Sequence, residues 1–241
     1  MHGPRRLSSS FGEYRDGHFH AGIDLRTFGK TGLPCLAIGD GDVSRVKIGP
    51  GGYGKALYLK LRDGNTAVYA HVDGFSWEVD SLCYHWRLDR GMSWCDLTVG
   101  SGDFGFGVGD TVSYSGKTGT SAPHLHFELR DEGGRPYNPL EVTYSLEDSR
   151  PPIISGLALV PIDPGSLVNG SPSTGYFDFR ASGSRSYSIA DTLILDGRIG
   201  FAVSLWDEQG YGQYRMAPLE VELRVDGERL YELRNSLFDY S

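Results

Sequence analysis

The sequence predicts a mostly-β protein, and three observations support this fold class. Glycine accounts for 34 of the 241 residues, about twice its usual share, which indicates many tight turns. The chain also holds 14 tyrosines, 11 phenylalanines and 4 tryptophans, residue types that strands favour. Two alternating segments, KALYLKL (55–61) and TAVYAHV (66–72), flank Asp63-Gly64, a pair typical of a tight hairpin turn.

Other segments extend this pattern, and one interrupts it. Three more alternating segments are expected as strands: 42–48, 111–116 and 124–130. Within 77–91, apolar residues such as Val79, Cys83 and Trp86 instead recur at helical spacing, so we expect a short helix inserted between strands. The rest of the insertion, about 77–107 in all, is expected as a glycine-rich loop.

The chain is expected to form two domains. The polar stretch SLEDSRPP (145–152) ends in two prolines and is typical of a linker. It separates a first domain, 1–145, from a second, 151–241. The second has several short alternating segments and an Asp226-Gly227 turn, which predict a partial immunoglobulin-like β-sandwich. We expect this second domain to be truncated or to continue downstream.

Charge and composition exclude some functions. With 23 basic and 31 acidic side chains the net charge is −8, which argues against a nucleic-acid or anionic-membrane binder. No apolar run approaches the ~18 residues that span a bilayer. The start, MHGPRRLSSSFGEYR, has no apolar core of a signal peptide. Three cysteines without a CxxC pair do not fix the compartment.

Two histidine motifs carry the chemistry. HFHAGIDL places His20 four residues before Asp24, and SAPHLHFELR places His124 and His126 on a predicted strand. The period of a strand puts these last two histidines on one face, with Leu125 toward the core. Two histidines and a carboxylate are a common three-ligand zinc set that leaves a fourth position for water. Each motif alone is commonplace and is weak evidence for a metal site. Both motifs together, in this order, favour one.

Longer stretches resemble a known family. FGEYRDGHFHAGID, YAHV, and SGKTGTSAPHLHFELR followed by NPL are similar to the lysostaphin-type (LytM-like) zinc murein endopeptidases over about 9–141. The resemblance implies a small antiparallel β barrel or sandwich of the duplicated hybrid motif type. It also implies a zinc metalloendopeptidase that cuts peptide cross-links or stems of bacterial cell-wall peptidoglycan with a metal-activated water.

The resemblance implies roles for six residues. His20, Asp24 and His126 match the ligands of one zinc ion per chain. His124 matches the histidine of the second motif that does not bind the metal and is expected as general base. His71, at the end of YAH, and Tyr14, six residues before His20, match groups that stabilise the transition state or shuttle its proton.

Alternatives remain open at this point. A noncatalytic cell-envelope regulator or wall-binding module on the same fold is the main rival, although no expected ligand is lost. A sugar-binding protein with structural zinc is weaker, because structural sites usually fill all four positions with Cys and His. Among substrates, a D,D-type cross-link is preferred over a glycine bridge because no wall-binding domain is evident.

The remaining expectations concern the envelope. An enzyme that acts on peptidoglycan is expected in the periplasm or cell envelope, with an export signal upstream of Met1. The C-terminal domain is a candidate surface for an envelope protein partner. The insertion is expected to reshape one wall of the substrate groove. Its two cysteines, Cys83 and Cys95, either form a disulfide or stay reduced, and reduced thiols are favoured.

Overall fold

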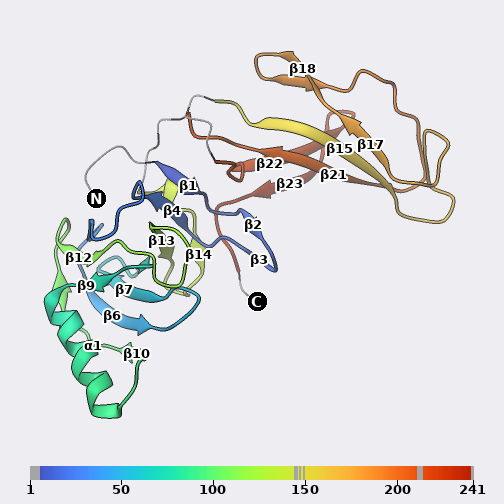
Figure 1. The fold of residues 1–241 in the computed structure, drawn as a ribbon. Coiled ribbons are helices and arrows are strands. Elements are labelled where there is room, and N and C mark those ends of the chain that lie inside the picture. The colour runs from blue at the N-terminus through green and yellow to red at the C-terminus, as the bar shows by residue number, and fades with distance from the viewer. Residues whose placement is uncertain (1–5, 144–145, 147, 149, 211–213, 240–241) are drawn as a thin grey trace. The chain divides into compact units, whose positions relative to one another are not determined.

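A computed structural model describes residues 6–143, 146, 148, 150–210 and 214–239. In these residues the chain is mostly β with one α-helix, as the sequence predicts (Figure 1). It divides into two compact units, 1–147 with 219–241, and 148–218. The division into domains 1–145 and 151–241 remains a prediction. In the structure, residues 219–241 group with the first unit and not with the second.

The first unit is built on an antiparallel sheet in the order β1-β4-β13-β8-β7-β6-β10, to which β11 and β14 add at β6 and β13. Its strands are β1 (Leu7–Ser9), β4 (Ile23–Arg26), β6 (Gly41–Ile48), β7 (Lys55–Leu61), β8 (Thr66–Ala70), β10 (Cys95–Thr98), β11 (Gly105–Phe106), β13 (His124–Arg130) and β14 (Pro136–Tyr137). The strand order has two ends, so the described strands form no closed barrel, and the barrel alternative is wrong.

Shorter elements complete the unit. A second sheet has the order β5-β12-β9, and two hairpins, β2–β3 and β22–β23, pair only within themselves. These elements are β2 (Tyr14–Arg15), β3 (His18–Phe19), β5 (Pro34–Leu36), β9 (Gly74–Phe75), β12 (Thr111–Tyr114), the 3-10 helix η1 (Pro139–Glu141), β22 (Glu220–Val225) and β23 (Glu228–Arg234). Asp226 and Gly227 both have positive φ, as the predicted turn between β22 and β23 requires.

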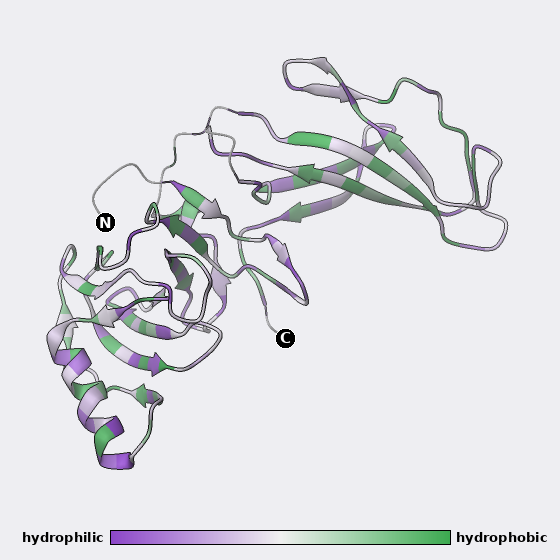
Figure 2. Cartoon of the chain, viewed as in Figure 1, coloured by the Kyte–Doolittle hydropathy of each residue, from purple (hydrophilic) through white to green (hydrophobic). Residues whose placement is uncertain are grey.

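The central strands are covered on both faces. Figure 2 shows hydrophobic and hydrophilic residues alternating along many strands, yet Ala56 to Leu59 of β7 and Leu125 to Leu129 of β13 are all buried. On one side of β13, Leu125, Phe127 and Leu129 belong to the apolar core. On the other side the same strand presents polar residues at every second position, and these form the site described below.

The insertion contains the predicted helix and two strands that the sequence did not reveal. Helix α1 (Trp77–Arg90) ends at Gly91, whose φ of 62° suits glycine. The glycine-rich loop expected after it is wrong in part, because β10 and β11 pair with the edge of β6. Pairing at an edge depends on the partner strand, so short segments can join it without a clear pattern of their own. Cys83 and Cys95 are buried free thiols.

The second unit holds a three-stranded antiparallel sheet, β17-β15-β21, and two strand pairs, β16–β20 and β18–β19. Its strands are β15 (Ile153–Pro161), β16 (Leu167–Val168), β17 (Gly175–Asp178), β18 (Arg180–Gly183), β19 (Ser186–Ser188), β20 (Leu195–Asp196) and β21 (Ile199–Trp206). The immunoglobulin-like sandwich is not confirmed, because β22 and β23, which carry the strongest alternation, group with the first unit. Across the described residues, no helix has both the length and the apolar character needed to cross a bilayer.

Candidate metal centre

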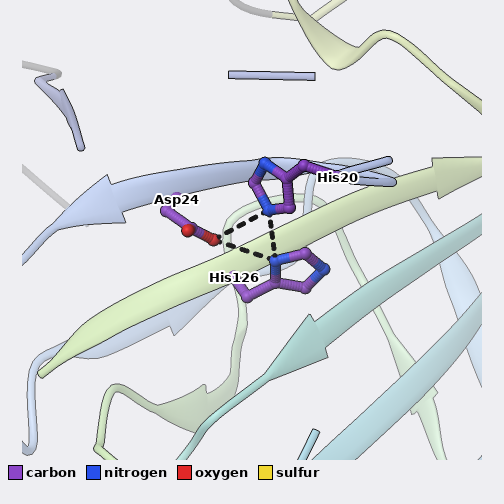
Figure 3. Close-up of side chains that lie close together, drawn as sticks. All are labelled: His20, Asp24 and His126. Atoms are coloured by element: carbon purple, nitrogen blue, oxygen red, sulfur yellow. Dashed lines mark hydrogen bonds and ion pairs between the residues drawn. The ribbon is translucent and has the colours of Figure 1, made fainter. Parts of the chain in front are cut away.

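Three buried side chains converge on one point of the first unit (Figure 3). His20 Nε2 lies 3.0 Å from His126 Nδ1. Asp24 Oδ1 lies 2.9 Å from His126 Nδ1 and 3.2 Å from His20 Nε2. These are the three residues that the sequence predicts as metal ligands, so residues 106 positions apart contribute to one cluster.

Strand pairing explains why these side chains meet. On the sheet His126 of β13 lies directly opposite Asp24 of β4 and Ala70 of β8, so His126 and Asp24 share a face on neighbouring strands. Gly22, just before β4, allows this approach, because a Cβ there would lie 2.3 Å from the carbonyl oxygen of Phe127. His20 reaches the point from the loop before β4, where its backbone N–H donates to the Glu13 carbonyl at 2.8 Å.

The outer nitrogen of each imidazole fixes which nitrogen faces the centre. His20 Nδ1 lies 2.7 Å from the carbonyl oxygen of Ser10. A carbonyl only accepts, so Nδ1 carries the proton and Nε2 presents its lone pair. His126 Nε2 lies 2.8 Å from Glu128 Oε1, and the same reasoning with a carboxylate turns the Nδ1 lone pair inward. The two imidazoles thus face the centre through different nitrogens.

The carboxylate of Asp24 is held ionised from both ends. Its second oxygen, Oδ2, accepts a hydrogen bond from the Arg15 guanidinium at 2.8 Å. Without a metal, the inner nitrogens of the two imidazoles can instead carry protons. Burial alone would raise the pKa of Asp24, but hydrogen bonds from protonated His126 and His20 hold that pKa far below its usual range. Burial would likewise lower the pKa of His126, whereas in this metal-free state its hydrogen bonds to Asp24 and Glu128 raise it to about 9. The cluster therefore attracts positive charge.

Glu128 is a buried support that the sequence reasoning missed. Its side chain is fully buried, and it accepts from Arg130 Nε at 2.8 Å and from the Tyr53 hydroxyl as well as from His126. The Tyr53 ring also stacks on the His126 ring with centroids 5.4 Å apart. The signal was present in HLHFELR, since the period that aligns His124 with His126 also aligns Glu128 and Arg130 on the same face.

His71 and His124 lie next to the cluster, with their rings edge to face 4.8 Å apart. Each donates Nδ1–H to a backbone carbonyl, His71 to Thr118 at 2.8 Å and His124 to Ala122 at 2.9 Å. Both therefore keep a free lone pair on Nε2, and His124 Nε2 lies 3.6 Å from Asp24 Oδ1. Burial lowers the pKa of His71 to about 4, so it is neutral at pH 7.

Tyr14 is placed differently. Its side chain is 71% exposed on the β2–β3 hairpin, where its ring meets the Phe19 ring edge to face at 5.8 Å. In the described part of the chain it makes no hydrogen bond or ring contact with the three-residue cluster. The hairpin is nevertheless adjacent to the site, because Arg15, the next residue, binds Asp24.

The chain is similar to known proteins over part of its length. No protein-family model matches the chain. A DD-carboxypeptidase/endopeptidase, Mpg, of Neisseria meningitidis is 32% identical over 144 residues, as is its Neisseria gonorrhoeae counterpart; the match covers 57% of this chain and 27% of the relative. The chain thus spans about a quarter of the length of these relatives.

Two solved structures are also similar. The catalytic domain of the prophage-encoded M23 protein EnpA from Enterococcus faecalis has a TM-score of 0.42 and 26% identity, covering 58% of this chain and 92% of that one. The catalytic domain of lysostaphin from Staphylococcus simulans has a TM-score of 0.43 and 22% identity, covering 58% and 93%. Each of these similarities covers little more than half of this chain.

The donor set of the three-residue cluster fits a zinc ion. Two imidazole nitrogens and one carboxylate oxygen are borderline donors that zinc prefers. Ligand atoms ~2.0–2.1 Å from a tetrahedral ion lie about 3.3–3.4 Å apart, and the three separations in the cluster, 2.9, 3.0 and 3.2 Å, are somewhat shorter than this. Both imidazoles have outer hydrogen-bond partners that orient their rings, as metal-binding histidines usually do.

Proposed function

We propose that the chain is a zinc metalloendopeptidase that hydrolyses peptides of bacterial cell-wall peptidoglycan. His20 Nε2, Asp24 Oδ1 and His126 Nδ1 would hold one zinc ion. The observation that carries the proposal is their convergence, with both imidazole lone pairs turned to the same point by outer hydrogen bonds. The similarity to proteins named DD-carboxypeptidase/endopeptidase supports a peptidase of the cell wall.

The neighbouring histidines fit proton transfer. When bound, zinc supplies a Lewis acid that polarises the scissile carbonyl and acidifies water. His124 Nε2 carries a free lone pair beside Asp24, so it accepts the proton that the attacking water loses and returns it to the leaving amine. Neutral His71 packs against the His124 ring. Because its Nδ1–H is bound to the Thr118 carbonyl, its Nε2 would accept a hydrogen bond from the same water. Tyr14 offers an exposed hydroxyl donor from the adjacent hairpin.

The preferred substrate is a D,D-type cross-link, because the matched relatives carry that activity in their names. Such a substrate places the protein in the periplasm or cell envelope. A partner there for the C-terminal part of the chain stays a prediction. The alternative, a noncatalytic regulator on the same fold, is not favoured, since all three candidate ligands and both neighbouring histidines are present and assembled.

Digestion of purified sacculi tests the proposal. Protein loaded with zinc should release cross-link fragments that mass analysis identifies, and a chelator should stop the release until zinc is restored. Elemental analysis should give one zinc per chain for the wild type and a large loss for Asp24→Ala. An Asp24→Ala protein that retains full zinc would refute the ligand set, and zinc-loaded wild type that leaves sacculi intact would support the regulator instead.

A further inference from the structure

A short segment near the end of the chain, Asn235–Phe238, is hydrogen-bonded to the first unit; we call it the docking segment. Asn138 donates its N–H to the Ser236 carbonyl at 2.8 Å and its Nδ2 to the Asn235 carbonyl at 2.9 Å. The N–H of Phe238 donates to the Pro136 carbonyl at 2.9 Å. The docking segment thus runs beside β14 and η1, more than 90 residues after them in the chain.

The docking segment also packs on the loop that leads to His20. The Phe238 ring stacks on Phe11, with centroids 4.3 Å apart, and on Phe19 at 5.5 Å. Asn235 is 4% exposed, and its side chain fills the space beside Gly12, where a Cβ would lie 2.4 Å from Asn235 Cγ. One ring and one amide therefore contact both ends of the segment from Phe11 to Phe19.

This loop in turn holds a candidate metal ligand. The N–H of Gly12 donates to the His20 carbonyl at 3.0 Å, and the N–H of His20 donates to the Glu13 carbonyl at 2.8 Å. His20 Nδ1 bonds the Ser10 carbonyl. A contact that fixes the backbone at Gly12 therefore fixes the backbone and the imidazole of His20 as well.

We propose that the docking segment positions the metal centre, with Phe238 and Asn235 as positioning residues that act through the loop and the β2–β3 hairpin. The inference rests on the proposed function for the identity of the metal. The docking segment contains none of the three candidate ligands and is given no chemical role. Without Phe238 the loop loses the ring that stacks on Phe11 and Phe19, so His20 and the hairpin that bears Tyr14 are held less firmly.

Phe238→Ala in the full chain tests this, compared with Phe238→Tyr, which keeps an aromatic ring, and Leu230→Ala as control. Leu230 lies on β23, the strand just before the docking segment, and is 66% exposed, so its truncation removes an apolar side chain that does not contact the loop. The first measurement is amide hydrogen exchange without metal. Phe238→Ala should speed exchange at Gly12 and His20 about tenfold and leave the central amides of β7 and β8 unchanged.

The second measurement is zinc affinity by competition with a chromophoric chelator. Loss of outer support typically weakens metal binding 10–100-fold, and we expect about tenfold for Phe238→Ala, near wild-type affinity for Phe238→Tyr, and no change for Leu230→Ala. Unchanged exchange at Gly12 and His20 would overturn the inference, whatever the enzyme does. So would an affinity loss accompanied by faster exchange throughout β7 and β8, which indicates general destabilisation. If the wild type bound no zinc, the proposed function would be refuted. The hydrogen-exchange result alone would then test the role of the docking segment.

Discussion

Replacing Glu128 with glutamine tests how much the support of His126 contributes to the metal centre, because the three candidate ligands are left unchanged. Glutamine keeps the shape and keeps an oxygen that accepts from His126 Nε2. It replaces the other oxygen, which accepts from Arg130, with an amide that donates. Two donors then face each other in a buried place, and the Arg130 charge loses its partner.

The size of the effect follows from the structure. Burial alone would raise the pKa of Glu128, but the hydrogen bond and charge of His126 and the charge of Arg130 lower it from 4.5 to about 2. This change of about 2.5 in pKa, at ~1.36 kcal/mol per pKa unit, corresponds to about 3 kcal/mol of stabilisation of the charged form. Breaking a buried pair costs about 3–5 kcal/mol, and the low end applies because the Arg130 side chain is 22% exposed.

The assay is thermal unfolding without metal, followed by zinc competition. A loss of about 3 kcal/mol should lower the Tm of a unit of this size by about 6–12 °C, and zinc affinity should fall 10–100-fold. Asp131→Asn is the matched control, since it removes one carboxylate charge one residue beyond the same strand, from an exposed pair with Arg135. If Glu128→Gln matched this control in both Tm and zinc affinity, the reasoning that Glu128 holds His126 would be refuted.

Four further outcomes are expected. Because the pKa of Glu128 is depressed, its stabilisation is complete above pH about 4.5 and is lost as pH falls toward 2, so acid titration of metal-free Glu128→Gln should show a shallower loss of unfolding free energy than the wild type. His124→Ala and His71→Ala should keep stoichiometric zinc while hydrolysis falls about 10²–10⁴-fold; if His124→Ala lost the metal while His126→Ala kept it, their roles would be reversed. Tyr14→Phe should lower kcat about 10²–10³-fold with zinc unchanged, and an unaltered kcat would exclude its hydroxyl from the transition state. Deleting residues 78–104 should leave zinc bound but change which sacculus fragments appear, and identical fragments would show that the insertion does not border the substrate.

Local patterns predicted much of the first unit. Alternation located the strands that became β6, β7 and β13 because these strands are long and one face of each meets the core. Helical spacing located α1 in the same way. The three candidate ligands were predicted from two motifs, since a ligand set needs specific residue types at specific spacing, and the structure places these three side chains together.

What the sequence did not reveal depends on partners distant in the chain. β10 is a strand because β6 offers it an edge, and the docking segment belongs to the first unit because Asn138 and Phe11 receive it. Tyr53, the partner of Glu128, lies in a glycine loop 75 residues away and has no local mark of its role. Such contacts are properties of the fold, so spacing along the chain carries little trace of them.

Because the docking segment is near the end of the chain, the order of synthesis affects when the metal centre is completed. The loop before His20 leaves the ribosome early, whereas Asn235 and Phe238 follow more than 90 residues after Asn138. At about 5–20 residues per second that interval is on the order of 5–20 s. Throughout it the first unit lacks the ring and the amide that fix the loop, so the centre matures only after the whole second unit has emerged. If the centre hydrolyses peptides as proposed, completing it last leaves it less time to act, or to bind a metal, while its own chain is still being synthesised.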